Sequence, residues 1–254
     1  MSIKSENRLT EIYHYLKDVG YASISELASI FSVSVSTIKR DLDKLNEQKM
    51  VDRIHGGAMI INTENIPSYN YRKNLNIDEK RRIGKAAADL IEENDVIYID
   101  TGSTCYELYT QIHAKNVTLF TINVPILSFK NPSISRLFVL EGEFFMDLSV
   151  ISGILTIENL SRINPSKLFF STSVISNDYE IQCQNDMSSI LYNKIVHMPG
   201  KKILLADASK IGLSDNFRVA DLSQVDVFIT DNRIKPSDVK AIRSLAPNTE
   251  IIIK

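Results

Sequence analysis

The sequence lacks the features that mark several classes of protein. It contains only two cysteines, Cys105 and Cys183, with no Cys-x-x-Cys spacing, so we expect neither a disulfide framework nor a metal site. No apolar run approaches the roughly 20 residues that a membrane-spanning helix needs, and the N-terminal stretch has no signal-peptide core. The net charge of −2 gives no basic coat for binding a membrane surface. Together these absences favour a cytoplasmic protein that uses no metal or cofactor.

The chain does contain enough apolar residues for more than one core. Its 254 residues are 44% hydrophobic and 24% charged, which is typical of a globular protein with one small and one larger domain. The periodic pattern breaks over residues 62–75, which include Pro67. We therefore predict a first domain over residues 1–61, a linker over 62–75 and a second domain over 76–254.

Residues 23–48 predict two short helices that pack across each other. Ser23 and Glu26 have the S-x-x-E spacing of a capping box, which starts the first helix. After a turn at 32–34, Ser34 can cap the second helix. The inner face of the second helix is apolar at helical spacing, through Ile38, Leu42 and Leu45.

The outer face of the second helix carries hydroxyls and cations, which suit phosphates and base edges in a DNA major groove. These candidate DNA-binding residues are Ser34, Ser36, Thr37, Lys39, Arg40 and Lys44. A β-wing follows, with strands expected at 50–54 and 58–61 around a tight turn. Arg53 and His55 of this wing would lie beside the DNA backbone or minor groove. Amphipathic helix pairs are also common outside DNA-binding proteins, and the wing is what favours a DNA reader here.

Net charge alone does not predict DNA binding. Residues 1–60 hold eight lysines and arginines against eight aspartates and glutamates. The electrostatic attraction to DNA must therefore come from where the cations are placed and not from a surplus of them.

These motifs resemble the N-terminal domain of DeoR-type bacterial repressors. The matching segments are SELA at 25–28, TIKRDL at 37–42 and RIHGGA at 53–58. Where the family usually has T-I-R-R-D-L, this chain has Lys39 in place of the first arginine. A lysine keeps a phosphate contact but loses the planar fork that reads guanine through two hydrogen bonds. The resemblance implies a winged helix-turn-helix domain that binds a double-stranded DNA operator.

From residue 76 onward, β-branched apolar runs alternate with helical segments. Strands are predicted at the runs VIYID, VTLFTI, RLFVLE, KLFFS, KILLAD, VFITD and EIIIK. A helix capped by Asp78 precedes the first run, and further helices are expected after Thr104, after Pro125 and near 156–163, 186–197 and 237–246. Continuous apolar strands separated by helices predict an α/β fold with a mainly parallel sheet covered on both faces.

Three of the strand ends carry polar residues, and ligands collect at the carboxyl ends of parallel strands. The segment DTGST at 100–104 could cradle a phosphate at a helix start, or form a plain turn in which Ser103 or Thr104 caps the helix. The second junction is TIN at 121–123. At the third, Asp207 and Lys210 could hold a sugar hydroxyl and a phosphate, or form only a surface ion pair.

The order of these junctions is similar to the effector domain of the same repressor family, which resembles ribose-5-phosphate isomerase. The resemblance therefore covers nearly the whole chain. It implies a repressor of a sugar-metabolism operon that a phosphorylated sugar releases from DNA. Because one reading head covers few base pairs, we also expect a homo-oligomer, either a dimer or a tetramer. The implied effector contacts are Asp100, Gly102, Ser103, Thr104, Asn123, Asp207 and Lys210.

One departure from the family pattern leaves alternatives open. After KLFF the family commonly has G-A-D-G, whereas this chain has Ser171–Val174 with the sequence STSV. The isomerases place an acidic base in that loop, so its absence argues against catalysis, for which Asp100 or Asp207 would have to serve as the base. The altered loop also fits a regulator whose ligand site has degenerated.

Overall fold

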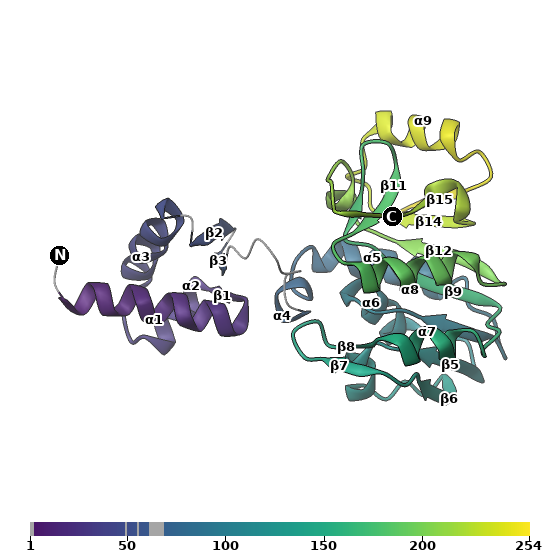
Figure 1. The fold of residues 1–254 in the computed structure, drawn as a ribbon, viewed down its shortest axis with the longest axis horizontal. Coiled ribbons are helices and arrows are strands. Elements are labelled where there is room, and N and C mark those ends of the chain that lie inside the picture. Colours follow the sequence, from purple (N-terminus) through teal and green to yellow (C-terminus); the bar gives the residue numbers. More distant parts are fainter. Residues whose placement is uncertain (1–2, 49, 55, 61–68) are drawn as a thin grey trace. The chain divides into compact units, whose positions relative to one another are not determined.

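The computed structural model describes residues 3–48, 50–54, 56–60 and 69–254 (Figure 1). The chain divides into two compact units, Met1–Leu75 and Asn76–Lys254, which we call the first and the second unit. In the part of the chain that is described, no helix combines the length and the apolar character that crossing a bilayer requires.

The first unit is a winged helix-turn-helix, as the sequence predicts. Three helices pack with a three-stranded antiparallel sheet whose strand order is β1-β3-β2. The helices are α1 (Ile3–Val19), α2 (Ile24–Ile30) and α3 (Val35–Glu47). The strands are β1 (Tyr21–Ser23), β2 (Val51–Ile54) and β3 (Gly57–Ile60).

Side-chain caps explain where the two short helices begin. Ser23 Oγ accepts a hydrogen bond from Glu26 N at 3.1 Å, and the Glu26 carboxylate accepts one from Ser23 N at 3.4 Å, which completes the predicted capping box. Ser34 caps α3 by accepting a hydrogen bond from Thr37 N at 3.2 Å. The predicted inner face of α3 is confirmed by the burial of Ile38, Leu42 and Leu45.

The first unit differs from the sequence prediction in three details. The sequence does not predict β1, because it is only three residues long and its last residue, Ser23, is the cap of α2. The wing strands are Val51–Ile54 and Gly57–Ile60. The first starts one residue later than predicted, and the second starts one residue earlier. The described part of the predicted linker, 62–75, contains the one-turn helix α4 (Tyr69–Arg72), which contacts β1.

The second unit is built on a seven-stranded sheet in which every neighbouring pair is parallel. The strand order is β15-β14-β12-β9-β4-β5-β6. The strands are β4 (Val96–Ile99), β5 (Val117–Thr121), β6 (Ile134–Val139), β9 (Lys167–Ser171), β12 (Lys201–Leu205), β14 (Val227–Thr230) and β15 (Glu250–Ile253). All seven apolar runs that the sequence predicts as strands are found in this sheet.

Helices cover both faces of the parallel sheet (Figure 1). One face packs against α5 (Ile77–Ala88), α6 (Ser103–Gln111) and the 3-10 helix η1 (Val124–Ser128). The other face packs against α7 (Ile154–Leu160), α8 (Asp186–His197) and α9 (Pro236–Leu245). Phe169 of β9 packs in the core beneath α5 and α6, whereas its chain neighbours Leu168 and Phe170 pack in the core on the opposite face. Because both faces are covered, the central strands carry apolar residues at consecutive positions, as in Ile97–Ile99 of β4 and Leu168–Phe170 of β9.

The sequence does not predict the smaller antiparallel elements. Strand β7 (Glu143–Phe145) pairs with β8 (Val150–Ser152), and β11 (Glu180–Cys183) pairs with both β10 (Val174–Ile175) and β13 (Phe217–Asp221). These strands are two to five residues long, which is too short to show a clear period. Two 3-10 helices follow β12 and β13, namely η2 (Ala208–Lys210) and η3 (Leu222–Gln224).

Helix α5 begins earlier than the sequence predicts. Asp78 is not its cap, because the N-cap is Asn76, in the left-handed conformation at φ 52° and without a side-chain cap bond. Asp78 lies in the first turn, where a carboxylate interacts favourably with the helix dipole. Its Oδ1 lies 3.6 Å from Arg81 Nη1. The Asn76 side chain instead bonds residues that follow β12.

An ion pair between α1 and α3 generates a first testable prediction. Arg8 Nε lies 2.6 Å from Asp41 Oδ2, and the Asp41 side chain is buried. Asp41→Asn should destabilise the first unit by about 1–3 kcal/mol, because a buried amide would replace the charged partner of Arg8. Hydrogen exchange of the α3 amides should then speed up roughly 5- to 150-fold. The exposed Asp52→Asn is the matched control, and exchange at the wild-type rate in Asp41→Asn would contradict the prediction.

Candidate functional site

The outer face of α3 presents the hydroxyls and cations that the sequence predicts for DNA binding. The exposed members are Ser34, Ser36, Lys39 and Arg40, and the half-buried ones are Thr37 and Lys44. The Ser34 hydroxyl lies 2.8 Å from the hydroxyls of both Ser36 and Thr37. This hydroxyl cluster lies at the start of α3, where backbone N–H groups and the helix dipole favour a phosphate.

Two ion pairs explain how a domain without surplus charge can present a basic helix face. Asp41 is paired with Arg8, and Asp43 accepts a hydrogen bond from Arg53 Nη1 at 2.6 Å. Within the described ranges, the exposed Lys39 and Arg40 have no carboxylate within ion-pair distance. Asp41 and Asp43 are thus paired inside the unit, and Lys39 and Arg40 give the outer face of α3 a basic character.

Arg53 is placed differently from the wing contact that the sequence predicts. Its Nη1 donates to the Asp43 carboxylate and, at 3.0 Å, to the carbonyl oxygen of Lys39, so the side chain ties β2 to α3. Its buried Nε has no hydrogen-bond partner among the residues that the structure describes. This geometry favours a positioning role for Arg53. His55, the other predicted wing contact, lies outside the described residues.

In the second unit, strand order reverses between β4 and β9. Strands β4, β5 and β6 follow one another in one direction, and β9, β12, β14 and β15 follow in the other. After β4 the chain continues into α6 on one face of the sheet, and after β9 it continues into β10 on the opposite face. Open parallel sheets bind ligands at such a switch point, on the edge where the strands end, which we call the carboxyl edge.

Three of the predicted effector residues meet at this switch point. Asn123 Nδ2 donates to the carbonyl oxygens of Asp100 at 3.2 Å and Gly102 at 3.0 Å. The backbone N of Asp100 donates to Phe169 O at 2.8 Å, which ties the same loop to β9. The first and second predicted junctions therefore form one cluster that is bonded to both neighbouring strands.

Asp100 is a fully buried carboxyl within this cluster. Burial raises its pKa from 3.8 to about 7, and the hydrogen bond that Asp100 Oδ1 accepts from the Tyr98 hydroxyl at 2.8 Å offsets only part of this rise. Near neutral pH the Asp100 carboxyl therefore exists in both protonation states. Depending on its proton, Oδ2 can donate or accept a hydrogen bond.

Helix α6 starts without a side-chain cap. Its N-cap is Gly102 at φ 106°, so the structure does not show the plain turn in which Ser103 or Thr104 caps the helix. Both of these residues are buried in the first turn. A Cβ on Gly102 would lie 2.8 Å from Ser171 Oγ, in a conformation that only glycine adopts readily. The first N–H groups of α6 are not used by a capping side chain, which suits the binding of an anion.

The segment Ser171–Val174, where the chain departs from the family pattern, joins β9 to the antiparallel sheet. Ser171 Oγ donates to Thr101 O at 3.3 Å. The buried Thr172 hydroxyl donates to the carbonyl oxygens of Val174 and Gln182, each at 3.0 Å. The hydroxyls that replace the usual acidic loop thus serve internal bonds.

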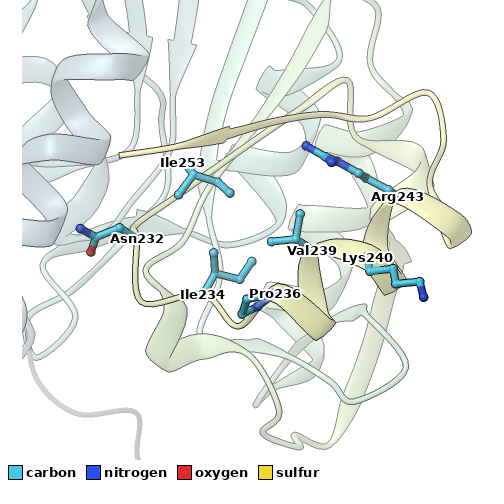
Figure 2. A pocket seen from close by; sticks show the side chains of 7 residues that line it. All are labelled: Asn232, Ile234, Pro236, Val239, Lys240, Arg243 and Ile253. Carbon is cyan, nitrogen blue, oxygen red and sulfur yellow. The ribbon is translucent and has the colours of Figure 1, made fainter.

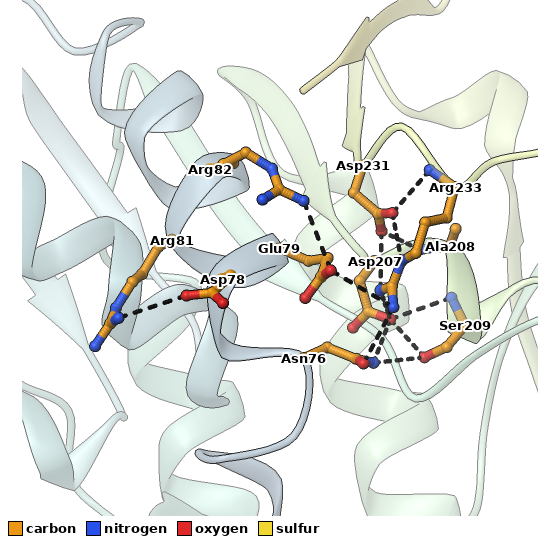
Figure 3. Close-up of polar contacts among 10 residues, drawn as sticks. All are labelled: Asn76, Asp78, Glu79, Arg81, Arg82, Asp207, Ala208, Ser209, Asp231 and Arg233. Carbon is orange, nitrogen blue, oxygen red and sulfur yellow. Dashed lines mark hydrogen bonds and ion pairs between the residues drawn. The ribbon is translucent and has the colours of Figure 1, made fainter.

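A second polar cluster lies at the end of β12 (Figure 3). Asp207 is buried, and its Oδ1 accepts hydrogen bonds from Asn76 Nδ2 at 3.1 Å and from Ser209 N at 3.1 Å. Lys210 ends η2 and is half-buried. Strand β9 lies between β4 and β12, so this cluster is two strand spacings, about 10 Å, from the Asp100 cluster.

Arg233 extends the second cluster to the end of β14 (Figure 3). Its Nε donates to Asp231 Oδ1 at 2.8 Å, and its Nη1 donates to Asn76 Oδ1 at 3.3 Å. Glu79 and Asp207 lie 3.6 Å and 3.8 Å from its guanidinium. Burial acts to raise the pKa of Asp231, but the bonds from Arg233 and backbone amides outweigh it and lower that pKa.

The sequence prediction omits Asn76, Asp231 and Arg233. A signal for Asp231 exists, because VFITD ends in aspartate just as VIYID and KILLAD do. The bond between Arg233 and Asn76 joins residues 157 positions apart, and no local pattern indicates it.

Buried polar atoms without partners converge on the carboxyl edge. The described residues include six such side-chain atoms, and five of them lie at the ends of β4, β5, β12 and β14. These five are Asp100 Oδ2, Thr101 Oγ1, Asn123 Oδ1, Asp207 Oδ2 and Thr230 Oγ1. Because unsatisfied buried polar groups are unfavourable, their convergence is typical of a site that binds a polar ligand.

A cavity of about 490 Å³ lies beside α9 and the edge strand β15 (Figure 2). Its lining is mostly apolar and consists of Asn232, Ile234, Pro236, Val239, Lys240, Arg243 and Ile253. None of the predicted effector residues lines it. The carboxyl edge, where polar groups converge, is therefore the better candidate for an effector site.

Two family models match the chain. The DeoR-like helix-turn-helix domain matches residues 8–64, and the DeoR C terminal sensor domain matches residues 75–232. The chain belongs to the DeoR family. The resemblance that the sequence motifs indicate is thereby confirmed for both parts of the chain.

Relatives of this DeoR-family chain are named as transcriptional regulators. It is 30% identical to the HTH-type transcriptional regulator GolR of Listeria innocua, with 89% of this chain and 91% of the relative covered. It is 30% identical to the lactose phosphotransferase system repressor of Streptococcus mutans, with 98% of this chain and 100% of the relative covered. It is 31% identical to the L-fucose operon activator of Haemophilus influenzae, with 88% of this chain and 90% of the relative covered.

Solved structures show weaker likeness. Ribose 5-phosphate isomerase from Plasmodium falciparum matches 52% of this chain and 52% of its own, at 17% identity and a TM-score of 0.37. A likeness at this level bears on neither the ligand nor the activity of the DeoR-family chain.

The raised pKa of Asp100 generates a second prediction. The unfolded carboxyl titrates near 3.8 and the folded one near 7, so the stability that proton binding contributes is present below about pH 4 and is lost as pH rises to about 7. Between pH 5 and 8 the wild type should lose about 2–3 kcal/mol through this group. Asp100→Asn should lack this loss in chemical denaturation at the two pH values. Exposed Asp178→Asn is the control, and the same pH dependence in wild type and Asp100→Asn would contradict the prediction.

Proposed function

We propose that this protein is a transcriptional repressor of a sugar-metabolism operon and that a phosphorylated sugar releases it from its operator. It works in the cytoplasm as a homo-oligomer, a dimer or tetramer, and catalyses no reaction. The observation that supports this best is the convergence of unpartnered buried polar atoms on the carboxyl edge, in a chain that also carries a DeoR-like helix-turn-helix domain. Two relatives bear the names of a lactose system repressor and an L-fucose operon activator.

We assign the DNA contacts to the outer face of α3. Arg40 has the planar fork that reads guanine, whereas Lys39 and Lys44 each offer a single charge suited to a phosphate. The hydroxyl cluster at the start of α3 adds neutral donors for the backbone. Arg53 acts indirectly, because its bonds to Asp43 and to the Lys39 carbonyl hold the wing against this helix.

Arg40→Ala and Lys39→Ala should weaken operator binding in different ways. Loss of a base contact by Arg40 should cost about 1–3 kcal/mol and relax specificity at one position. Loss of a phosphate contact by Lys39 should weaken binding to all sequences alike and lower the salt dependence by about one charge. Gel-shift titration at two salt concentrations, on an operator selected from random DNA, separates these effects. Exposed Lys115→Ala is the control, and wild-type affinity in both variants would exclude α3 as the reading helix.

We place the effector on the carboxyl edge. Sugar hydroxyls can donate to Asp100 Oδ2, Asn123 Oδ1 and Asp207 Oδ2, which have no internal partner among the described residues. The phosphate can lie at the start of α6, where Gly102 allows close backbone approach and Lys210 adds positive charge. The spacing of about 10 Å between the two clusters suits an extended polyol phosphate better than a lone anion.

Asn76 supports a route from this site toward the DNA-binding unit. It is the first residue of the second unit, and its side chain bonds Asp207, Ser209 and Arg233 at the carboxyl edge. A ligand that replaces these bonds would loosen the start of α5 and the chain that leads into the first unit. A ligand that binds one state more tightly than the other then shifts the population of DNA-binding molecules.

One observation favours a second candidate function, the isomerisation of a sugar phosphate. A pKa of about 7 would suit Asp100 as a general base at neutral pH. Two observations oppose it, because Tyr98 holds one Asp100 oxygen and the Ser171–Val174 segment contains no acidic residue. Isomer formation by the purified protein, followed by NMR and abolished in Asp100→Asn, would establish catalysis and exclude a purely regulatory role.

Thr101→Val should weaken effector binding and leave the fold intact. Thr101 Oγ1 makes no hydrogen bond with the described residues, so valine removes a ligand contact and no internal bond. A lost hydrogen bond of about 1–1.5 kcal/mol corresponds to roughly tenfold weaker binding. Lys210→Ala should weaken binding further by removing charge. The half-buried Thr118→Val, near the amino end of β5, is the matched control.

A thermal-shift screen of phosphorylated sugars measures these effects, since a ligand at 100 times its Kd adds roughly 2.7 kcal/mol of stability. Equal affinity of Thr101→Val and the wild type would remove Thr101 from the site. Failure of the wild type to bind any phosphorylated sugar would favour the alternative of a degenerate site at Ser171–Val174.

A further inference from the structure

An exposed valine opens the helix to which the DNA contacts are assigned. Val35 is the first residue of α3, directly after the cap Ser34, and its side chain is 46% exposed. Among the described side chains of the winged helix-turn-helix, the other large apolar one with similar exposure is Ile30, which ends α2 and is 47% exposed. The sequence prediction omits Val35, because it selects hydroxyls and cations.

The start of α3 projects from the core of the first unit. Val35 and Ser36 are exposed and Thr37 is half-buried, and the first buried residue of the helix is Ile38. Residues four apart are neighbours on a helix surface, so Val35 lies beside Lys39. In helix-turn-helix proteins the N-terminal residues of the recognition helix contact the base edges. Val35 therefore lies where a base edge would meet the helix.

The hydroxyl side chains around Val35 are engaged with one another. Ser34 Oγ accepts a hydrogen bond from Thr37 N at 3.2 Å and lies 2.8 Å from the hydroxyls of both Ser36 and Thr37. Val35 adds an apolar contact to this turn. Its branched side chain has one strongly preferred rotamer in a helix, so it loses little conformational freedom when a partner covers it.

Among the four bases, thymine offers the partner that suits a valine in the major groove. Thymine presents a 5-methyl group there, whereas the amino groups and ring nitrogens of the other bases present donors and acceptors. Valine methyl groups over a polar base edge would leave that edge without a hydrogen bond, which is unfavourable. Lys39 can reach a phosphate through its flexible four-carbon stem, but the short Val35 contacts only what lies directly against the helix.

The helix geometry also gives the distance between two readings. Val35 and Arg40 are five residues apart, which is about 7.5 Å along the helix axis. Successive bases of a DNA strand rise about 3.4 Å, so a helix that follows the groove places the two side chains about two base pairs apart.

We propose that Val35 reads the 5-methyl group of a thymine that lies about two base pairs from the guanine read by Arg40. This inference rests on the proposed function, in which the outer face of α3 makes the DNA contacts. It goes further by naming a base that an apolar side chain selects, in addition to the contacts made by the cations and hydroxyls.

Uracil in place of thymine tests this contact, because it removes the 5-methyl group and keeps the hydrogen-bonding groups of the base. An operator is selected from random DNA with the full chain, and each of its thymines is then replaced in turn. In fluorescence anisotropy titrations, replacement of the proposed thymine should weaken binding of the wild type about three- to tenfold, as expected for one buried methyl group or slightly more.

Val35→Ser should bind the thymine and the uracil operators equally, because serine has no methyl group to set against the base. The exposed position of Val35 means that this substitution leaves the core of the first unit unchanged. Val35→Ile keeps a branched apolar side chain and should still prefer thymine. Ile30→Ser is the matched control, since Ile30 is equally exposed but lies on α2, and it should keep the wild-type preference.

A selected operator without thymine near the guanine, or a thymine preference that persists in Val35→Ser, would overturn the proposal. If Arg40→Ala and Lys39→Ala weaken binding while every uracil operator binds the wild type as tightly as the thymine operator, α3 remains the reading helix and the valine contact is wrong. If neither of these two variants changes binding, the assignment of the DNA contacts to α3 is wrong, and the valine contact is excluded with it.

Discussion

Parallel pairing brings the carboxyl ends of all seven strands to one edge of the sheet, and the reversal of strand order between β4 and β9 gathers polar side chains there. Asp100 and Asp207 are buried at this edge, each with one oxygen that has no partner among the described residues. Such groups make the unliganded edge less stable than a fully bonded one. In the proposed function, a polar ligand that supplies the missing bonds would offset this cost and so stabilise the state that binds it.

Two routes lead from this edge to more distant parts of the chain. The bonds around Asn123 lead to the β7–β8 hairpin, and the bonds of Asp207 and Arg233 to Asn76 lead to the start of α5. In the first unit, Arg8 and Arg53 neutralise two aspartates of α3, so that the basic character of its outer face does not depend on net charge. In the proposed function, a ligand that displaces the bonds of Asn76 would alter the start of α5, the first helix of the second unit.

Much of the fold follows from local sequence. The S-x-x-E capping box, the spacing of Ile38, Leu42 and Leu45, and the seven apolar runs each indicate an element that the structure confirms. The short strands β10, β11 and β13 could not be predicted, because they exist only through pairing with distant segments. Among the candidate site residues, Asp100 and Asn123 lie at predicted strand ends and meet. Arg233 and Asn76 could not be found, since their roles arise from tertiary contacts between the two ends of the second unit.

If effector and operator favour different states of one molecule, thermodynamic linkage requires each of them to weaken the binding of the other. The affinity of a phosphorylated sugar should be measured by titration calorimetry for the free protein and for its operator complex. Sugar binding to the complex should be weaker than to the free protein, by the same factor by which the sugar weakens operator binding, about 5- to 150-fold for a typical coupling. Equal sugar affinity of the free and the operator-bound protein would contradict it.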